Sequence, residues 1–276
     1  MEIRTVHANG LEFAYLAVGD GPLAMCLHGF PDTAHTWRHL MPALAARGYR
    51  AVAPFMRGYA PTEATDVVEP GALVADAAAL HEALGGDEQA VVIGHDWGTV
   101  PVYATTGRFR RSVALAVPPP NAGVLGRLDY EQLKRSFYAF LFQTGLGAAA
   151  VAQPEFIAGL WRDWSPGYDA EDDLAFVAAS LAGPANRAAA IGYYRAMFGT
   201  AEPTGRYVAE QAAVFEGPVG PVLYLHGEKD GCLASALVQD VKLPEGSRMV
   251  TVADAGHFLH LERPEEVNAL VLDWLE

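Results

Sequence analysis

The chain has few basic residues and few cysteines. Its 276 residues include 19 Lys and Arg against 33 Asp and Glu, which leaves a formal charge of −14. A surface of this sign repels phosphate groups, so we expect no nucleic acid as a partner. The only cysteines are Cys26 and Cys232, far apart and without the Cys or His spacing of a metal site. We therefore expect two free thiols, no metal and no cofactor.

Long hydrophobic runs and a leader-like beginning are also missing. No uninterrupted apolar run reaches the length of a membrane span, and residues 1–10 lack a basic segment followed by an apolar one. These absences indicate a soluble, cytoplasmic protein without a membrane partner. The composition leaves the oligomeric state open, and a homodimer is one alternative.

What the chain does have, through residue 117, is a regular alternation of short apolar runs and helical patterns. Two strands, at residues 3–8 and 11–18, are joined at Asn9-Gly10, a pair that tolerates the positive φ angles of a two-residue hairpin. The later apolar runs are unbroken, as in strands that are covered on both faces of a sheet. Strands are expected at residues 23–27, 49–54, 90–93 and 113–117, and helices at 37–47, 71–84 and 99–106. This predicts an α/β fold with a mostly parallel central sheet flanked by helices.

The alternation stops at Pro118–Pro120. The following residues, as far as 211, are rich in Ala and aromatic residues and contain no convincing strand. Leu133, Phe137 and Leu141 recur at helical spacing, and a second helix is expected at residues 185–198. The earlier pattern resumes with strands at 219–225 and 248–253 and a helix at 264–275. We therefore expect a core domain of residues 1–117 and 212–276, interrupted by a helical cap of residues 118–211.

The segment GHDWG at residues 94–98 follows an apolar strand and has a glycine two positions on either side of Asp96. Small residues at these positions allow a sharp strand-to-helix turn that exposes the central side chain. Serine, the usual nucleophile of such a turn, is absent, and a carboxylate can take its place by attacking carbon to form an ester. Alternatively, Asp96 only caps the helix that follows.

Three further motifs follow strands. The segment HGFPD at residues 28–32 comes directly after the strand 23–27, Asp230 lies in the loop after the strand 219–225, and His257 follows the last strand. The chain order nucleophile, acid, base assigns Asp230 as the orienting acid and His257 as the general base. Nearby residues leave alternatives open, namely the acids Glu228 and Asp254 and the histidines His28, His226 and His260.

Together these segments resemble the epoxide hydrolases of the α/β-hydrolase family, from about residue 13 to the C-terminus. The resemblance implies an α/β-hydrolase fold and a cofactor-independent hydrolase whose reactants are a small epoxide and water. By this likeness Asp96 forms a covalent alkyl ester, and water activated by His257 hydrolyses it to release a vicinal diol. The backbone N–H groups of Phe30 and Trp97 would form the oxyanion hole.

The same family carries two cap tyrosines that donate a proton to the epoxide oxygen. By likeness to its motifs, the segments 138–143 and 192–195 place these acids at Tyr138 and Tyr194. Tyr130 and Tyr193 are the near alternatives. For a single aromatic residue in an apolar helix, core packing is the more common role.

The resemblance also indicates which residues contact the substrate: Phe30, Trp97, Trp161 and Phe258. The apolar and aromatic cap favours an apolar or aryl epoxide. One departure is Phe55, which stands where relatives often carry an acid, and it suggests a pocket of different shape.

Two other functions remain as alternatives. Haloalkane dehalogenases share the aspartate turn and would hold the halide with Trp97, and Trp161 and Trp164 keep this alternative open. They often have Asn or Glu, then Pro-Thr, where this chain has Phe30–Asp32, and many place their acid where Pro118–Asn121 offers none. A leaving halide needs no proton, so the tyrosine pair separates the two reactions. The other alternative is a non-catalytic binding protein with the same fold.

Overall fold

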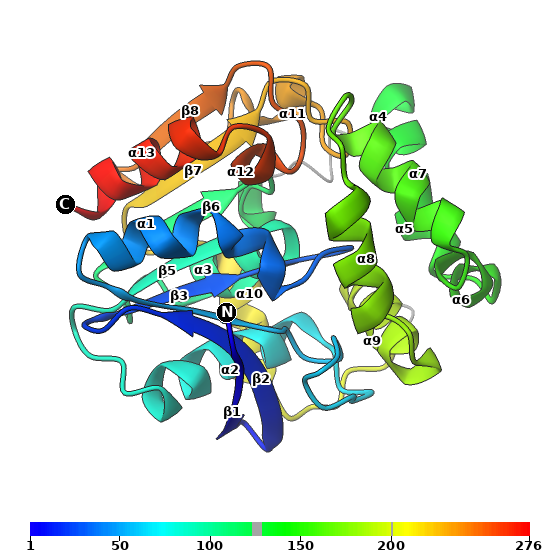
Figure 1. The fold of residues 1–276 in the computed structure, drawn as a ribbon. Coiled ribbons are helices and arrows are strands. Elements are labelled where there is room, and N and C mark those ends of the chain that lie inside the picture. Colours follow the sequence, from blue (N-terminus) through cyan, green and yellow to red (C-terminus); the bar gives the residue numbers. More distant parts are fainter. Residues whose placement is uncertain (123–128, 200) are drawn as a thin grey trace.

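The structure, a computed structural model, describes residues 1–122, 129–199 and 201–276. Its strands are β1 (Ile3–Ala8), β2 (Leu11–Val18), β3 (Leu23–Leu27), β4 (Arg50–Pro54), β5 (Val91–His95), β6 (Arg111–Leu115), β7 (Val222–Gly227) and β8 (Arg248–Val252). They form one sheet in the order β1-β2-β4-β3-β5-β6-β7-β8 (Figure 1). β1 and β2 are antiparallel to their neighbours, and the other pairs are parallel. The expected α/β class with a mostly parallel sheet is confirmed.

Helices cover both faces of the sheet. One layer contains α1 (Leu40–Ala46), α12 (Leu259–Glu262) and α13 (Pro264–Leu275), and the other contains α2 (Pro70–Ala83), α3 (Thr99–Ala104) and α10 (Val208–Glu216). Short helices occur in loops at η1 (Ala34–Arg38), η2 (Asp96–Gly98) and α11 (Ser235–Val238). β3, β5 and β7 are buried along their whole length, which explains why their sequences are unbroken apolar runs.

A helical layer lies along one end of the sheet, drawn in green in Figure 1. It contains α4 (Tyr130–Arg135), α5 (Phe137–Leu141), α6 (Leu146–Val151), α7 (Pro154–Trp164), α8 (Glu171–Ser180) and α9 (Pro184–Met197). η3 (Pro120–Ala122) precedes this layer in the chain and contacts α10. Of the expected cap, residues 123–128 and 200 lie outside the described residues. Within the described ranges no single helix is long and apolar enough to cross a bilayer, whereas α8 and α9 together would pass by length and composition but bend by 103°.

Local sequence patterns locate most of these elements. The hairpin turn has the expected positive φ angles, 46° at Asn9 and 78° at Gly10. The continuous helix suggested by the spacing of Leu133, Phe137 and Leu141 is wrong, because the chain turns at Ser136 between α4 and α5. Leu133 and Phe137 are exposed there, so this spacing does not mark a core face.

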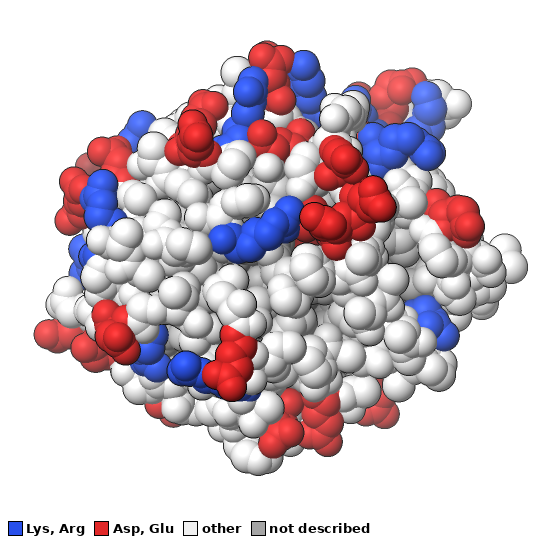
Figure 2. Space-filling view, viewed as in Figure 1, with Lys and Arg blue, Asp and Glu red and all other residues white. Residues whose placement is uncertain are grey.

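The charge of the chain is distributed over its surface. On the face shown in Figure 2, acidic and basic side chains are interspersed among uncharged ones, without a broad basic area. This face therefore has no local concentration of Lys and Arg, in keeping with the net charge of −14 of the chain.

α10 packs against the core helix α2. The Gly71 N–H of α2 donates to Gln211 Oε1 at 2.8 Å, and a Cβ built on Gly71 would lie 2.8 Å from both Gln211 N and Tyr207 O. The boundary expected after residue 211 thus falls inside a helix that contacts the core. We propose that the cap ends before α10.

This contact predicts an effect on stability. Gly71→Ala should lower the free energy of unfolding by about 1–3 kcal/mol, because the added methyl group overpacks the interface between α2 and α10. Thermal and urea unfolding measure the loss. Gly145→Ala is the matched control, since a Cβ there has no neighbour within 4 Å. Equal stability of both variants would contradict this account of the interface.

Candidate active site

Asp96 lies at a sharp turn between β5 and η2. Its backbone has a φ of 52°, a left-handed conformation that is uncommon for a residue with a side chain. A Cβ on Gly94 would lie 2.2 Å from Gly98 O, and one on Gly98 would lie 2.1 Å from Leu27 O. Both positions therefore require glycine, and the turn presents the Asp96 carboxylate at the carboxyl edge of the parallel strands.

The loop after β3 passes directly over this turn. The Phe30 N–H donates to Asp96 Oδ1 at 2.7 Å. A Cβ on Gly29 would lie 2.2 Å from that same oxygen and 2.5 Å from Trp97 N, so only glycine allows this approach. Phe30 therefore binds one carboxylate oxygen in the manner of an oxyanion-hole donor, and the second donor expected, the Trp97 N–H, lies beside the same loop.

The imidazole of His257 lies between two carboxylates. Its Nδ1 is 3.0 Å from Asp230 Oδ2, and its Nε2 is 3.7 Å from Asp96 Oδ2. Burial alone would lower the pKa of His257, but the negative charges of Asp230 and Asp96 outweigh it and raise the pKa to about 10. Likewise, burial would raise the pKa of Asp230, but His257 lowers it below its usual value. The structure thus brings the three residues that the motif order singled out into one chain of contacts.

The alternative acids and bases have other partners. Asp254 is exposed and pairs with Lys229 at 2.6 Å. His28 Nε2 accepts from the Met56 N–H at 2.9 Å, and His226 Nδ1 lies 2.8 Å from Tyr224 Oη. None of these contacts reaches the Asp96 carboxylate.

A small cavity of about 180 Å³ opens at Asp96. Tyr138 of α5 and Tyr194 of α9 line it from the cap side, with their ring centroids 5.5 Å apart. Burial, with smaller effects from nearby polar groups, raises the pKa of both phenols well above the usual value, so both keep their protons at neutral pH. The near alternatives lie elsewhere: Tyr193 Oη donates to Arg57 O at 2.8 Å, and Tyr130 is 74% exposed.

The other aromatic residues expected at the substrate do not all line this cavity. Trp97 does, but Phe30, Trp161 and Phe258 are not among its lining side chains. Trp161 stacks on Phe258 with centroids 3.5 Å apart, and its indole N–H donates to Pro31 O at 2.9 Å. Direct contact of this pair with substrate is not favoured by the geometry. We propose instead that it fastens the cap to the core.

The cavity also contains residues that the sequence motifs did not mark. Its lining includes Val100, Pro118–Pro120, Gln132, Met197, Phe198, Cys232 and Leu233. Most of these are apolar, and they come from segments far apart in the chain. In the sequence, only the apolar and aromatic composition of the cap indicated an apolar pocket. Phe55, the departure noted in the sequence, is buried and does not line the cavity.

The carboxyl end of α7 contacts both loops of the acid and base. The Trp164 carbonyl accepts from the Gly231 N–H at 3.0 Å and from the His257 N–H at 2.9 Å. The Phe258 N–H donates to Ser165 Oγ at 3.0 Å. A Cβ on Gly231 would lie 1.8 Å from Asp163 O, so the acid loop and the cap pack backbone against backbone. The cap therefore helps to place the acid and the base.

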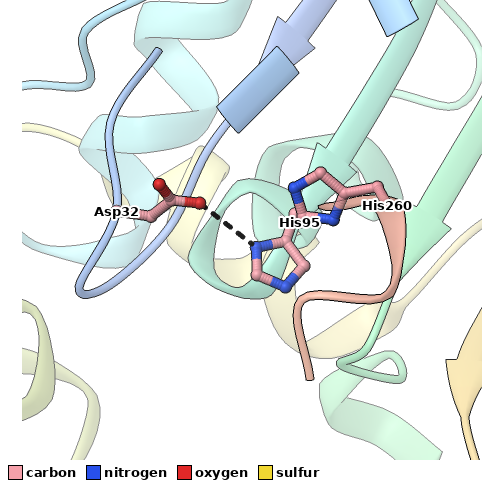
Figure 3. A group of neighbouring side chains, drawn as sticks. All are labelled: Asp32, His95 and His260. Carbon is pink, nitrogen blue, oxygen red and sulfur yellow. Dashed lines mark ion pairs between the residues drawn. The ribbon is translucent and has the colours of Figure 1, made fainter. Parts of the chain in front are cut away.

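A second group of buried polar side chains adjoins β5, the strand that leads to Asp96. Asp32 Oδ2 lies 4.0 Å from His95 Nδ1, and the ring of His260 lies next to that of His95, with centroids 4.6 Å apart (Figure 3). Burial raises the pKa of Asp32 to about 8 and lowers the pKa of His95 to about 3. Both side chains are therefore mainly uncharged at neutral pH.

This second group bears on whether the chain holds a metal. One polar atom from each of Asp32, His95 and His260 lies within 4.8 Å of the others. Zinc bonds to N and O are about 2.0–2.2 Å long, so ligand atoms as far apart as Asp32 Oδ2 and His95 Nδ1 would subtend about 150° instead of a tetrahedral angle. The spacing does not fit such an ion. His95 Nε2 instead donates to His257 O at 2.9 Å, which ties this group to the base.

The Alpha/beta hydrolase family model matches residues 24–270. The chain is 30% identical to epoxide hydrolase A of Mycobacterium tuberculosis, with 99% of this chain and 96% of that protein covered. It is 31% identical to epoxide hydrolase 3 of Xenopus tropicalis, with 97% and 76% covered. For epoxide hydrolase 3 of Siraitia grosvenorii the identity is 29%, with 98% and 97% covered.

Solved structures show the same similarity. A putative epoxide hydrolase from Klebsiella pneumoniae superposes with a TM-score of 0.84 at 24% identity, covering 99% of this chain and 97% of that one. An epoxide hydrolase from Vigna radiata superposes with a TM-score of 0.77 at 26% identity, with the same coverage. The α/β-hydrolase fold expected from the sequence is confirmed.

The position of His257 between two anions predicts how its pKa responds to their removal. Asp96→Asn should lower the pKa of His257, because one of the charges that stabilise the imidazolium is lost. Asp230→Asn should lower it further, since Asp230 is the closer anion. NMR titration of the ring resonances measures both shifts. A His257 pKa that stays unchanged in both variants would contradict the assigned electrostatics.

Proposed function

The chain belongs to the alpha/beta hydrolase family, and within it we propose that it is an epoxide hydrolase that works through a covalent ester of Asp96. One observation carries this proposal: a carboxylate at the strand-to-helix turn and two protonated phenols line the same small cavity. The similarity to proteins named epoxide hydrolases over almost the whole chain supports it. The substrates are a small epoxide and water.

In the first step, Asp96 Oδ2 attacks a ring carbon of the epoxide. Oδ1 is held by the Phe30 N–H, so it becomes the carbonyl oxygen of the ester while Oδ2 forms the new C–O bond. The C–O bond of the ring breaks toward its oxygen. That oxygen would leave as a strongly basic alkoxide, and it takes a proton from Tyr138 or Tyr194.

In the second step, water attacks the ester carbonyl and His257 takes its proton. Ester formation neutralises Asp96, which removes one of the two charges that raise the pKa of His257. The imidazolium therefore passes its proton to the phenolate left by the first step, and the imidazole becomes a base only when the ester is present. The Phe30 and Trp97 N–H groups hold the oxyanion on Oδ1. When the intermediate collapses, the imidazolium protonates the leaving alkoxide, and the proton on the new Asp96 carboxyl group passes to His257, which restores the resting imidazolium.

The cavity favours a small apolar or aryl epoxide. Its volume is about 180 Å³, and Val100, Pro119, Met197 and Leu233 are among its lining residues. Such walls are mainly apolar, and the phenols of Tyr138 and Tyr194 are among the few polar groups that face the cavity. Styrene oxide is a suitable first substrate.

A haloalkane dehalogenase is the second candidate, favoured by Trp97 in the cavity wall. Displacement of a halide needs N–H donors and no acid, so it would leave both cavity phenols without a role. Trp161, another indole considered for halide, donates its N–H to Pro31 O and lies outside the cavity lining. The geometry therefore supports the epoxide more strongly.

The covalent mechanism predicts an isotope pattern. In ¹⁸O-labelled water, a single turnover of styrene oxide with excess enzyme should place the label on Asp96, because water attacks the enzyme's own ester. His257→Gln should accumulate a protein adduct with the mass of the epoxide. Intact-protein and peptide mass spectrometry measure both. Label that appears only in the diol, with no adduct in the variant, would rule out the ester.

The role of the phenols predicts a selective loss. The double variant Tyr138→Phe with Tyr194→Phe should lose diol formation by a hundredfold or more, because it removes both proposed proton donors. Halide release from a bromoalkane, if measurable, should change little. Tyr130→Phe is the matched control on an exposed cap position and should retain the wild-type rate. A double variant as active as this control would refute the assignment.

A further inference from the structure

The thiol of Cys232 contacts the hydroxyl of Tyr138 inside the cavity. Sγ lies 3.3 Å from Oη, and either atom can be the donor at this distance. The hydroxyl of Tyr194 has no hydrogen-bond partner of standard geometry within the described part of the chain. The two phenols share one cavity but differ in this neighbour.

The place of Cys232 is set by the acid loop and by the cap. Its N–H donates to Asp230 Oδ1 at 2.7 Å, and its carbonyl accepts from Gln132 Nε2 of α4 at 2.8 Å. The sulfur, a carboxylate oxygen of Asp230 and a ring nitrogen of His257 lie within 4.8 Å of one another. The thiol therefore stands between the acid and base on one side and Tyr138 on the other.

This thiol keeps its proton. Burial raises the pKa of Cys232 well above the usual value, and the carboxylates of Asp230 and Asp96 act in the same direction. A protonated thiol is a weak nucleophile and a hydrogen-bond donor. Cys232 is thus suited to donate to an oxygen that acquires negative charge, and unsuited to attack an electrophile.

We propose that Cys232 is a positioning residue for Tyr138, to which its S–H donates a hydrogen bond. The inference rests on the proposed epoxide hydrolysis. With the thiol as donor, the single proton of the phenol is free to point at the epoxide oxygen. When that proton passes to the alkoxide, negative charge forms on Oη, where the S–H already points. The proton of the thiol stays on sulfur throughout, so the proton balance of the first step is unchanged.

The contact makes the two phenols unequal. A hydrogen bond to an ionised acceptor is about twice as strong as one between neutral groups, so the thiol stabilises the phenolate of Tyr138 more than its phenol. Tyr138 is thereby the principal proton donor. Tyr194, which has the Trp97 side chain as its polar neighbour instead of a thiol, mainly orients the epoxide oxygen.

The test measures ester formation in a single turnover of styrene oxide by rapid quench and intact-protein mass. Cys232→Ala should slow ester formation about tenfold and affect ester hydrolysis much less. Cys232→Ser should recover at least half of the lost rate, because its hydroxyl can also donate. Ester formation at the wild-type rate in Cys232→Ala would overturn the inference.

A double-mutant cycle separates positioning from a general structural effect. In the Tyr138→Phe background, Cys232→Ala should change the rate of ester formation less than twofold, since the oxygen it serves is gone. In the matched Tyr194→Phe background it should retain its tenfold effect. Equal effects of Cys232→Ala in both backgrounds would overturn the inference.

Cys232→Val provides a second donor-free variant should the alanine variant fold poorly, and thermal unfolding identifies the folded ones. Either folded variant must slow ester formation for the inference to stand. No diol from any epoxide with the wild-type protein would overturn both this inference and the proposed function. Diol formation by the wild type, together with wild-type rates of ester formation in the donor-free variants, would overturn the role of the thiol alone.

Discussion

The active site depends on a close backbone approach between the loop after β3 and the turn at Asp96. β3 and β5 are parallel neighbours, so both segments leave the sheet at the same edge. Gly29 and Gly98 leave no room for a Cβ at this crossing, and Asp96 adopts a positive φ angle there. Such a conformation costs on the order of 1–3 kcal/mol and persists because the surrounding strands impose it. Because of this conformation, the Phe30 N–H already donates a hydrogen bond to the Asp96 carboxylate.

In the proposed mechanism, the imidazole of His257 changes its role when the charge of Asp96 changes. His257 is buried, yet two anions hold its proton in the resting protein. Its basicity is therefore coupled to the charge of Asp96, which the proposed ester formation would remove. The second group, Asp32, His95 and His260, contributes no net charge near neutral pH, and through His95 it fixes the backbone of the base. The charges that act on His257 therefore come from Asp96 and Asp230, whereas its backbone is held through His95.

Much of this arrangement could be predicted from local sequence. The strands were readable because buried parallel strands are continuous apolar runs, and Asp96, Asp230 and His257 were singled out because each follows a strand. The resemblance to a family placed Tyr138 and Tyr194. The roles that the sequence does not reveal depend on contacts between segments that are far apart in the chain. Residue spacing carries no information about such contacts. Cys232 gave no signal of its contact with Tyr138, and Trp161 was expected at the substrate although it stacks on Phe258.

The carboxyl end of α7 holds the backbones of the acid and base loops at the Trp164 carbonyl. This contact joins the cap to the core beside Asp230 and His257, whereas Trp161 to Pro31 and Tyr193 to Arg57 join it at other places. We therefore expect that a cap exchanged from a related protein must carry a turn that fits against Gly231 and Gly256. Otherwise the loops of Asp230 and His257 would lose their present alignment.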